Sequence, residues 1–252
     1  MRVAVLSDIH ANLRALDAIL ARIGAVDEIW HLGDVVGYGP DPDAVVGRLR
    51  QLGARGVQGN HDLAATGDDV IRDFNADARS AMEWTRRVIS AETLDWLAAL
   101  PPTLTIGSFN LAHGSPRDPT WEYILSTAAA AANLAIMPTA WGLFGHTHLP
   151  WAYLAAPRSG SPAAPSSQVG PIEEVEPAAE GSLGLANRLA LVNPGSVGQP
   201  RDGNPASSGL ILDTDTVEVS WVRAPYDIKA TQAAMRSAGL PPRGVERLSQ
   251  GF

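Results

Sequence analysis

Five short segments rich in histidine, aspartate and glycine constrain this chain more than any other feature. They contain five of its six histidines and occur in the order Asp8-Ile9-His10, Gly33-Asp34, Gly59-Asn60-His61-Asp62, His113-Gly114 and Gly145-His146-Thr147-His148. Each contains a side chain that can ligate a divalent cation. If these side chains form one site, the fold has to bring together loops that lie far apart in the sequence.

The first sixty residues alternate between strand-like and helix-like patterns. Residues 2–7 are almost continuously apolar, which predicts a strand buried on both faces. Apolar residues at helical spacing then predict a helix over 13–23. A strand over 27–32, a helix over 42–52 and a strand over 55–58 follow. A ligand-type residue lies just past the end of each strand, where open α/β sheets place their ligand sites.

The rest of the chain predicts further helices and strands around the later segments. These are a helix over 75–100, a hairpin of strands 104–106 and 109–113, a helix over 127–137, strands over 142–144, 151–154, 189–193, 209–213 and 216–223, and a helix over 227–238. Residues 156–187 are rich in Pro, Ser, Gly and Ala and predict a surface insertion within a single domain that spans 1–252. We expect the last dozen residues to form a loose tail.

The composition excludes several classes of protein. The chain has 252 residues, no cysteine and a formal net charge of -8. The absence of cysteine excludes disulfides, zinc–thiolate sites, iron–sulfur clusters and a cysteine nucleophile. The basic residues are scattered, which argues against general binding to nucleic acids. No apolar run is long enough to cross a membrane or to act as a secretion signal, so we expect a cytoplasmic protein.

Seven side chains in the five segments are candidate metal ligands: Asp8, His10, Asp34, Asn60, His113, His146 and His148. Asp8 and His10 are two positions apart at the end of a predicted strand, so an extended backbone would point both side chains the same way. His146 and His148 have the same spacing. Asp34 has two carboxylate oxygens and could bridge two ions. Imidazoles, carboxylates and one amide suit Mn, Fe, Zn, Ni or Co.

The ordered segments resemble those of the calcineurin-like metallophosphoesterase superfamily. The resemblance covers residues 3 to about 155 with every motif present, and the order and spacing are highly specific. Residues 7–12, 33–40 and 193–201 resemble most closely the small bacterial and archaeal phosphodiesterases of the superfamily. The last of these extends the resemblance almost to residue 225.

The resemblance implies a role for each segment. It implies that one ion is held by Asp8, His10, Asp34 and His148, and the other by Asp34, Asn60, His113 and His146. It also implies that His61 is the general acid and that Asp62 orients it. The cofactors would be two divalent transition-metal ions, with manganese favoured and Fe, Zn, Ni or Co as alternatives.

The resemblance also implies a four-layer α/β/β/α sandwich with two mixed β-sheets. The residue pattern alone indicates only an α/β fold with a strand-rich C-terminal half. Two ions beside Asp8 and Asp34 would acidify a bridging water to hydroxide near neutral pH, and this nucleophile would attack phosphorus directly. We therefore expect a metal-dependent phosphoesterase, and within that class a phosphodiesterase acting on small molecules or nucleotides.

Two alternative functions stay open at this point. One is a phosphatase that acts on monoesters, dinucleoside polyphosphates or phosphoproteins. The other is a non-catalytic scaffold that binds partner proteins, which the intact ligand set and His61 argue against. The expected partner is a small phosphorylated substrate, with no membrane and no general nucleic-acid binding. The oligomeric state does not follow from the sequence.

Several residues have both a structural and a functional interpretation. We interpret His31 as a hydrogen-bonded core histidine, because its parity in the predicted strand is opposite to that of Asp34. Asn12 either caps the helix that follows it or binds substrate at the edge of the site. Arg201 either binds a phosphate or is solvated.

The segment Gly195-Ser196-Val197-Gly198 is either an anion-binding turn or a plain loop. Tyr38 and its proline-containing loop could form the wall of a nucleobase pocket. Trp121 and Tyr123 could do the same, although core packing is the favoured interpretation for both.

Overall fold

The computed structural model describes residues 1–67, 69–156, 169–178 and 180–252, which form two six-stranded sheets and surrounding helices. The first sheet has the order β3 (Arg55–Gly56), β2 (Glu28–His31), β1 (Arg2–Leu6), β11 (Ser207–Asp213), β12 (Glu218–Ala224) and β9 (Ser182–Gly184). The second has the order β4 (Thr103–Ile106), β5 (Phe109–Ala112), β6 (Trp141–Leu143), β10 (Leu189–Pro194), β7 (Pro150–Ala155) and β8 (Glu173–Val175).

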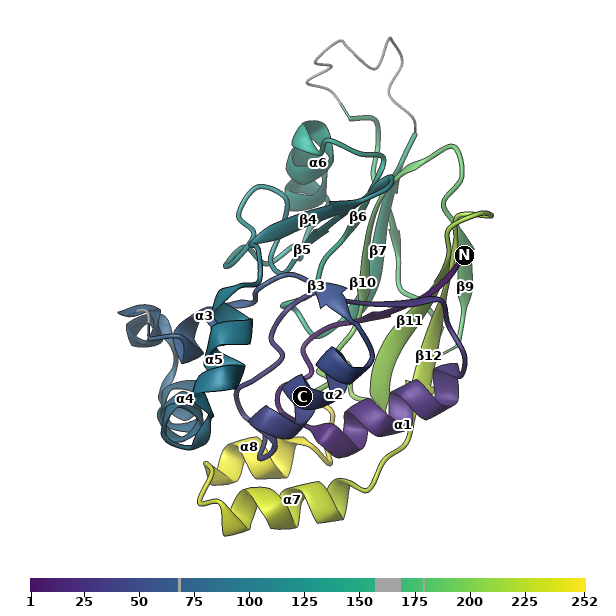
Figure 1. Ribbon diagram of the computed structural model, residues 1–252. Coiled ribbons are helices and arrows are strands. Elements are labelled where there is room, and N and C mark those ends of the chain that lie inside the picture. The colour runs from purple at the N-terminus through teal and green to yellow at the C-terminus, as the bar shows by residue number, and fades with distance from the viewer. Residues whose placement is uncertain (68, 157–168, 179) are drawn as a thin grey trace.

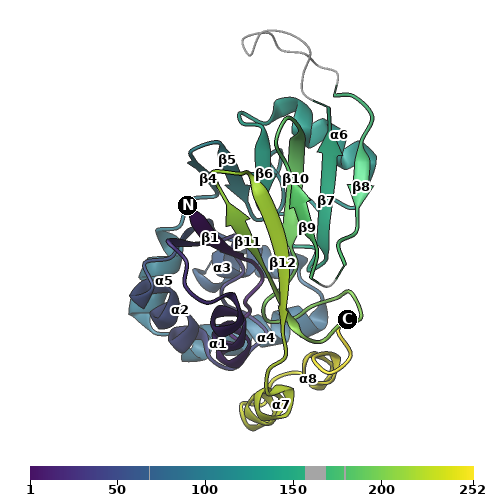
Figure 2. The ribbon, with the colours of Figure 1, turned by 90° about the vertical axis from the view of Figure 1, so that its right-hand side faces the viewer.

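The two sheets pack face to face, with helices outside both (Figures 1 and 2). Val3 and Val5 of β1 lie in the core between the sheets, whereas Ala4 and Leu6 lie in a second core under the helices. Burial on both faces explains why β1 is continuously apolar. The predicted four-layer α/β/β/α sandwich is confirmed.

Nine helical segments surround the sheets in the described part of the chain. They are α1 (Leu13–Ile23), α2 (Pro42–Gln51), α3 (Asn60–Ala65), the 3-10 helix η1 (Asp69–Asp73), α4 (Ala76–Val88), α5 (Ala91–Ala98), α6 (Thr127–Ile136), α7 (Ile228–Ser237) and α8 (Pro242–Arg247). Helix α1 packs on the first sheet and α6 on the second. Among the described residues, no helix is both long and apolar enough to cross a lipid bilayer.

The strand directions bring the five segments to one edge of the sandwich. Strands β1, β2 and β3 are parallel neighbours, with Leu6 beside His31 and His31 beside Gly56. In the second sheet, β5, β6 and β10 are also parallel. Because parallel strands end at the same edge of a sheet, the loops that follow them leave the sheet side by side. The ligand-bearing segments occupy these loops.

Two expected elements differ from the observed ones. The helix predicted over 75–100 is two helices, because the chain turns at Ile89 and Ser90 caps α5 by accepting a hydrogen bond from Thr93 N at 3.2 Å. The predicted loose tail is wrong, since it contains α8. Val245 and Leu248 of this segment are buried against α7 and α4.

The predicted insertion over 156–187 lies partly outside the described residues, which omit 157–168 and 179. Its described parts contribute an edge strand to each sheet. Strand β8 pairs antiparallel with β7, and β9 pairs antiparallel with β12. These parts are therefore more regular than the composition indicates.

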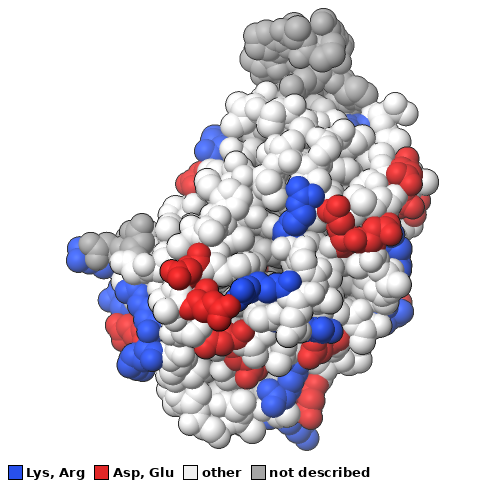
Figure 3. Space-filling model, in the orientation of Figure 1, with Lys and Arg blue, Asp and Glu red and all other residues white. Residues whose placement is uncertain are grey.

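Acidic and basic side chains are interspersed on the face shown in Figure 3. Exposed ion pairs include Arg48–Asp17, Arg50–Glu92 and Arg55–Glu28. On the described part of this face we see no continuous basic patch of the kind that binds nucleic acids.

His31 is fully buried as predicted, but its expected hydrogen bonds are not formed. Within the described structure, neither ring nitrogen has a hydrogen-bond partner, and the ring lies 5.6 Å from that of Trp96. Burial lowers the pKa of His31 to about 4, from an ordinary value of 6.5. The folded protein therefore keeps His31 neutral at a pH at which the unfolded chain protonates it.

We expect His31→Leu to weaken the acid sensitivity of folding. Because the folded-state pKa is depressed, protonation of His31 in the unfolded chain has little effect on stability above pH 6.5 and lowers the free energy of unfolding progressively as pH falls toward 4. Between pH 7 and 4.5 the variant should lose about 2 kcal/mol less than the unsubstituted chain. Urea unfolding of metal-stripped samples measures the difference, and parallel pH curves for the two chains would contradict it.

Candidate metal centre

Five of the predicted ligands lie in backbone conformations that L-residues rarely adopt. The φ angles of Asp8, His10, Asp34, His146 and His148 are 52°, 50°, 51°, 65° and 61°. The expectation of an extended backbone at the paired ligands is therefore wrong. Asp8 and His10 still join one group, whereas His146 and His148 join different groups. Each left-handed residue costs about 1–2 kcal/mol, and such strain persists only where the surroundings impose it.

Backbone hydrogen bonds between loops impose these conformations. Asp8 N donates to Gly33 O at 3.1 Å, and His10 N donates to Asp34 O at 2.9 Å. Close contacts fix the loops further, because a Cβ added to Gly59 would lie 2.2 Å from Asp34 Oδ1. The loops after β1, β2 and β3 therefore form one interlocked unit.

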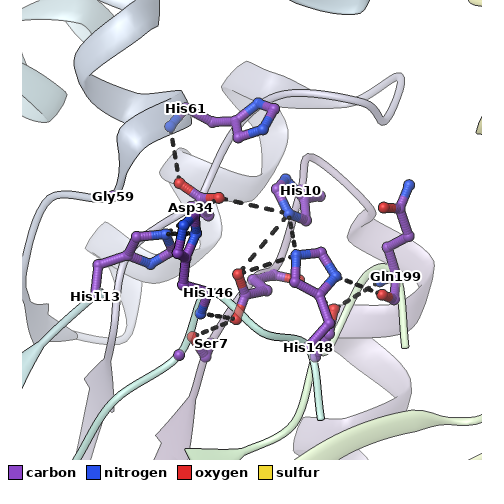
Figure 4. Close-up of polar contacts among 12 residues, drawn as sticks. Ser7, His10, Asp34, Gly59, His61, His113, His146, His148 and Gln199 are labelled. Atoms are coloured by element: carbon purple, nitrogen blue, oxygen red, sulfur yellow. Dashed lines mark hydrogen bonds and ion pairs between the residues drawn. The ribbon is translucent and has the colours of Figure 1, made fainter. Parts of the chain in front are cut away.

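The structure brings all seven predicted ligands together at this unit. Figure 4 shows five of them, which are His10, Asp34, His113, His146 and His148. One buried group contains Asp8, His10, Asp34 and His148, and a second contains Asp34, His113 and His146; within each, the candidate ligand atoms lie within 4.8 Å of one another. Asn60 joins the second group, with its Oδ1 3.0 Å from His113 Nε2. Asp34 is the member common to both.

Hydrogen bonds fix which nitrogens of the first group carry lone pairs. His10 Nδ1 lies 3.2 Å from Val36 O, and His148 Nδ1 lies 2.6 Å from Gln199 O. A carbonyl oxygen only accepts, so both Nδ1 atoms carry the proton. The two Nε2 atoms therefore present lone pairs to each other at 3.1 Å. Two facing lone pairs need a cation between them, which is the observation that fits a metal here.

The second group has the same character. His113 Nδ1 donates to Leu32 O at 2.8 Å, so its Nε2 carries a lone pair. That Nε2 lies 3.0 Å from Asn60 Oδ1 and 3.4 Å from Asp34 Oδ2, both of which are acceptors. His146 Nδ1 lies 3.0 Å from the same nitrogen. Acceptor atoms thus converge here as well.

The two buried carboxylates carry negative charge that the neighbouring protein groups do not neutralise. Burial raises the pKa of Asp34 well above its ordinary value, and the nearby negative charge of Asp8 raises it further. Burial also lowers the pKa of His148, and the charge of Arg201 lowers it further. Neutral imidazoles cannot offset the two carboxylates, so divalent cations would relieve the crowding of negative charge.

His61 lies beside the ligands without belonging to either group. Its backbone N donates to Asp34 Oδ1 at 2.9 Å, whereas its ring lies 4.6 Å from that of Tyr38 and 4.6 Å from that of Phe74. Its buried Nδ1 has no hydrogen-bond partner among the described residues. Burial and then the charge of His113 lower its pKa.

The expected contact from Asp62 to His61 is absent from the hydrogen bonds of the described residues. Asp62 Oδ1 instead accepts from Val35 N and Val36 N at 2.9 and 3.1 Å, and its Oδ2 accepts from Gly59 N at 3.0 Å. Asp62 therefore ties the Asp34 loop to the start of α3. Packing against aromatic rings, and not a carboxylate, orients the His61 ring.

A cavity of about 560 Å³ opens above the two groups. Its lining includes Asp34, Asn60, His61, His146 and His148 from the ligand segments, four aromatic residues (Tyr38, Phe74, Trp121 and Tyr123) and three arginines (Arg201, Arg243 and Arg247). Tyr38 lies at the wall of the cavity, as predicted. No described residue of 156–187 lines this cavity.

Trp121 and Tyr123 both line the cavity. Trp121 also packs against the core under the helices, as favoured from the sequence, whereas core packing of Tyr123 is wrong. Tyr123 is 48% exposed and stacks on the His146 ring at 3.9 Å. The signal for this placement was their position soon after His113, in a loop and not in a periodic element.

Asn12 has the capping role. Its Oδ1 accepts from Ala15 N at 3.2 Å, and its Nδ2 donates to Gly198 O at 3.1 Å and to Tyr226 Oη at 3.2 Å. The side chain is buried and its hydrogen-bonding capacity is used inside the protein, which contradicts the proposed substrate contact.

The turn at Gly195–Gly198 is a structural loop. Val197 N donates to Ser7 O and Gly198 N donates to Asp8 O, at 2.9 and 3.0 Å. A Cβ added to Gly198 would lie 1.9 Å from Ile9 O, so glycine is required for this approach. The turn supports the first ligand loop and has no free N–H groups for an anion at these two positions.

The comparisons of this chain with known proteins agree on one family. Residues 1–217 match the profile of the calcineurin-like phosphoesterase superfamily domain. The chain is 40% identical to a metallophosphoesterase from Sphaerobacter thermophilus of known crystal structure, with a TM-score of 0.85 over 100% of this chain and 99% of that one. It is 33% identical to an uncharacterized protein of Methanocaldococcus jannaschii, over 99% of this chain and 98% of that protein.

A more distant match concerns a protein with a named substrate class. The symmetrical bis(5'-nucleosyl)-tetraphosphatase of Dechloromonas aromatica is 31% identical over 144 residues. The match covers 54% of this chain and 49% of that protein. It therefore spans about half of each.

We expect Asp34→Asn to empty both metal positions, because Asp34 is the one carboxylate that both groups contain. His113→Gln should empty only the second position, since the first group retains all four members. Elemental analysis of each purified variant, loaded under one protocol, measures the metal content per chain. Equal loss in the two variants would contradict a shared Asp34.

Proposed function

Since this chain belongs to the calcineurin-like phosphoesterase superfamily, and is therefore a hydrolase of phosphoester bonds, we propose that it uses two divalent transition-metal ions to hydrolyse small molecules or nucleotides. Phosphodiesters are the substrates we propose first. The donor set of imidazoles, carboxylates and an amide suits Mn, which we propose as the preferred ion, with Fe, Zn, Ni and Co as the other metals that suit these donors.

The observation that carries this proposal is the sharing of Asp34 between two buried groups at the floor of one cavity. Two cations held there would acidify a water between them and neutralise charge on a phosphoryl group. The seven ligands hold these positions with little freedom, because the ligand loops are locked by backbone hydrogen bonds. Such preorganisation is the main protein contribution to this kind of catalysis.

His61 is the proposed general acid. It lines the cavity beside Asp34, and its ring is held by Tyr38 and Phe74. The ring Nδ1 is buried against Gly37, where an added Cβ would lie 2.4 Å away, so Nε2 is the nitrogen that would hold the transferable proton. A phosphoryl anion in the cavity would favour the protonated imidazolium, opposing the effect of burial on its pKa. The proton would then pass to the leaving alkoxide.

The cavity supports a small substrate with a flat group. Tyr38, Trp121 and Tyr123 provide aromatic surface next to the metal centre, and Tyr123 is already stacked on His146. A volume of about 560 Å³ is in the range of pockets for nucleotide-sized ligands. Dinucleoside polyphosphates are the second candidate substrate class, which the partial match to a bis(5'-nucleosyl)-tetraphosphatase favours.

We expect His61→Gln to retain both metals and to lose hydrolysis rate to an extent that depends on the leaving group. With a nitrophenyl leaving group, which departs without protonation, the loss should be small. With an alkyl or nucleoside leaving group it should approach the roughly 10²–10⁴-fold effect of general acid catalysis. Elemental analysis and kcat for matched esters measure the two parts, and an emptied metal centre would contradict the separation of acid from ligands.

We also expect activity to depend reversibly on added metal. Metal-stripped protein should be inactive and should regain hydrolysis with Mn above the level given by Mg, because imidazole ligands favour transition ions over Mg. Phosphate or nitrophenol release with a monoester and its matching diester tests substrate preference. Full activity after metal removal would contradict the proposal, and faster monoester cleavage would replace the diester with the phosphatase alternative.

A further inference from the structure

The C-terminal helices contribute to the cavity from outside the part of the chain that matches the family profile. That match ends at residue 217, whereas α7 and α8 follow it. Figure 1 shows the two helices stacked beside α1 and α4 at one end of the molecule. Arg243, Gly244 and Arg247 of α8 line the cavity. The wall formed by α8 is therefore an addition to the metal centre itself.

Arg243 and Arg247 are four positions apart, so they lie on the same face of α8. Arg201 lines the same cavity. It lies two residues after Gln199, whose carbonyl oxygen accepts a hydrogen bond from His148 Nδ1. Burial lowers the pKa of the Arg247 guanidinium, and the charges of Arg201 and Arg243 lower it further. Three guanidinium groups therefore gather around one cavity.

Their charges are incompletely paired. Within the described residues, no Asp or Glu carboxylate lies within 4.0 Å of the side-chain nitrogens of Arg201 or Arg247. In the described structure, Arg201 Nε is buried without a hydrogen-bond partner. Its Nη2 donates to Gln199 Oε1 at 3.1 Å, and the side chain is also hydrogen-bonded to Tyr123. Arg247 Nε donates to Phe252 O at 2.6 Å, which leaves its terminal nitrogens for a ligand. Arg243 has a contact of 4.0 Å with Asp77 and is largely exposed.

The three arginines line the cavity from two elements, Arg201 from the loop after β10 and the other two from α8. Arg201 lies beside the first ligand group, because its backbone N donates to His148 O at 3.3 Å. Arg201 and Arg247 both lower the pKa of Tyr38, against the larger effect of burial, so Tyr38 lies near both. The metal groups would take one phosphoryl group, and the arginines continue the positive charge toward α8. Guanidinium groups with free terminal nitrogens bind phosphate strongly.

We propose that Arg201, Arg243 and Arg247 bind a second phosphate of the substrate, beyond the one that is cleaved. The natural substrate then carries at least two phosphates, as a nucleoside diphosphate or a longer polyphosphate does. This inference rests on the proposed function for the cleaved phosphate. It assigns to α8 the selection of polyphosphorylated substrates.

Arg247→Gln tests this inference, with Arg236→Gln as the matched control. Arg236 is exposed on α7 and does not line the cavity, so both changes remove one charge from the C-terminal helices. Calorimetry of the Mn-loaded protein compares α,β-methylene-ADP, AMP and methylenebisphosphonate. We expect Arg247→Gln to weaken α,β-methylene-ADP about tenfold or more and AMP less than about twofold. Arg236→Gln should change neither.

Methylenebisphosphonate separates recognition of the two phosphates from recognition of the nucleoside, because it has no nucleoside. If its binding weakens together with that of α,β-methylene-ADP, the second phosphate is recognised by itself. If the bisphosphonate binds unchanged while α,β-methylene-ADP weakens, Arg247 does not recognise that phosphate and the inference is wrong. Equal weakening of AMP and α,β-methylene-ADP would also overturn it.

The failure of this inference is distinguishable from failure of the proposed function. Hydrolysis of nitrophenyl phosphate by the unsubstituted Mn-loaded protein reports on the metal centre, because this ester has one phosphate. If the protein hydrolyses it and Arg247→Gln still shows no selective loss of α,β-methylene-ADP, the inference fails while the proposed function stands; if the protein does not hydrolyse it, the proposed function fails. Should Arg247→Gln melt at a lower temperature than Arg236→Gln, the more exposed Arg243→Gln provides a second variant. It should weaken α,β-methylene-ADP in preference to AMP, and no selective loss would contradict the inference.

Discussion

The structure depends on a backbone constraint: ligand side chains converge because their own residues are held in left-handed conformations. Five ligands share this conformation, which is unfavourable for each of them in isolation. The hydrogen bonds that oppose this cost run between loops, such as Asp8 N to Gly33 O and His10 N to Asp34 O. The metal centre is thus a property of the assembled sandwich edge, and no single loop can form it alone.

This constraint explains the role of residues that contribute no ligand atom. Both carboxylate oxygens of Asp62 accept hydrogen bonds from backbone N–H groups of neighbouring loops. Gly59 and Gly198 stand where any side chain would collide with a ligand loop. These residues fix the positions of Asp8 and Asp34 before any cation binds. The favourable free energy of folding the two sheets therefore offsets the backbone strain and the charge repulsion within the site.

The sequence predicted the parts of this arrangement that depend on pattern. Strand periodicity placed the ligand segments at strand ends, and the resemblance supplied the grouping of ligands around Asp34. What could not be predicted depends on three-dimensional packing. Nothing local to Asp62 shows that its oxygens bond to Val35 and Val36 in another loop. The left-handed turn at His10 was mistaken for extended backbone because both can bring residues two apart together.

The C-terminal helix shows a different cause of error. Pro242 at the start of α8 and the buried pair Val245 and Leu248 are a helix signal, but six residues give too little periodicity to separate it from a tail. Its arginines acquire a role only through the position of α8 beside the cavity. The function of charged residues in a short segment therefore cannot be predicted until the position of that segment in the fold is known.

The Nε2 lone pairs of His10 and His148 face each other because a cation belongs between them. Anomalous diffraction from crystals grown with Mn tests this most directly. The account predicts two peaks per chain, one bounded by His10 and His148 and one by His113 and His146, with Asp34 bonded to both. A single peak, or metal bound away from these side chains, would contradict it.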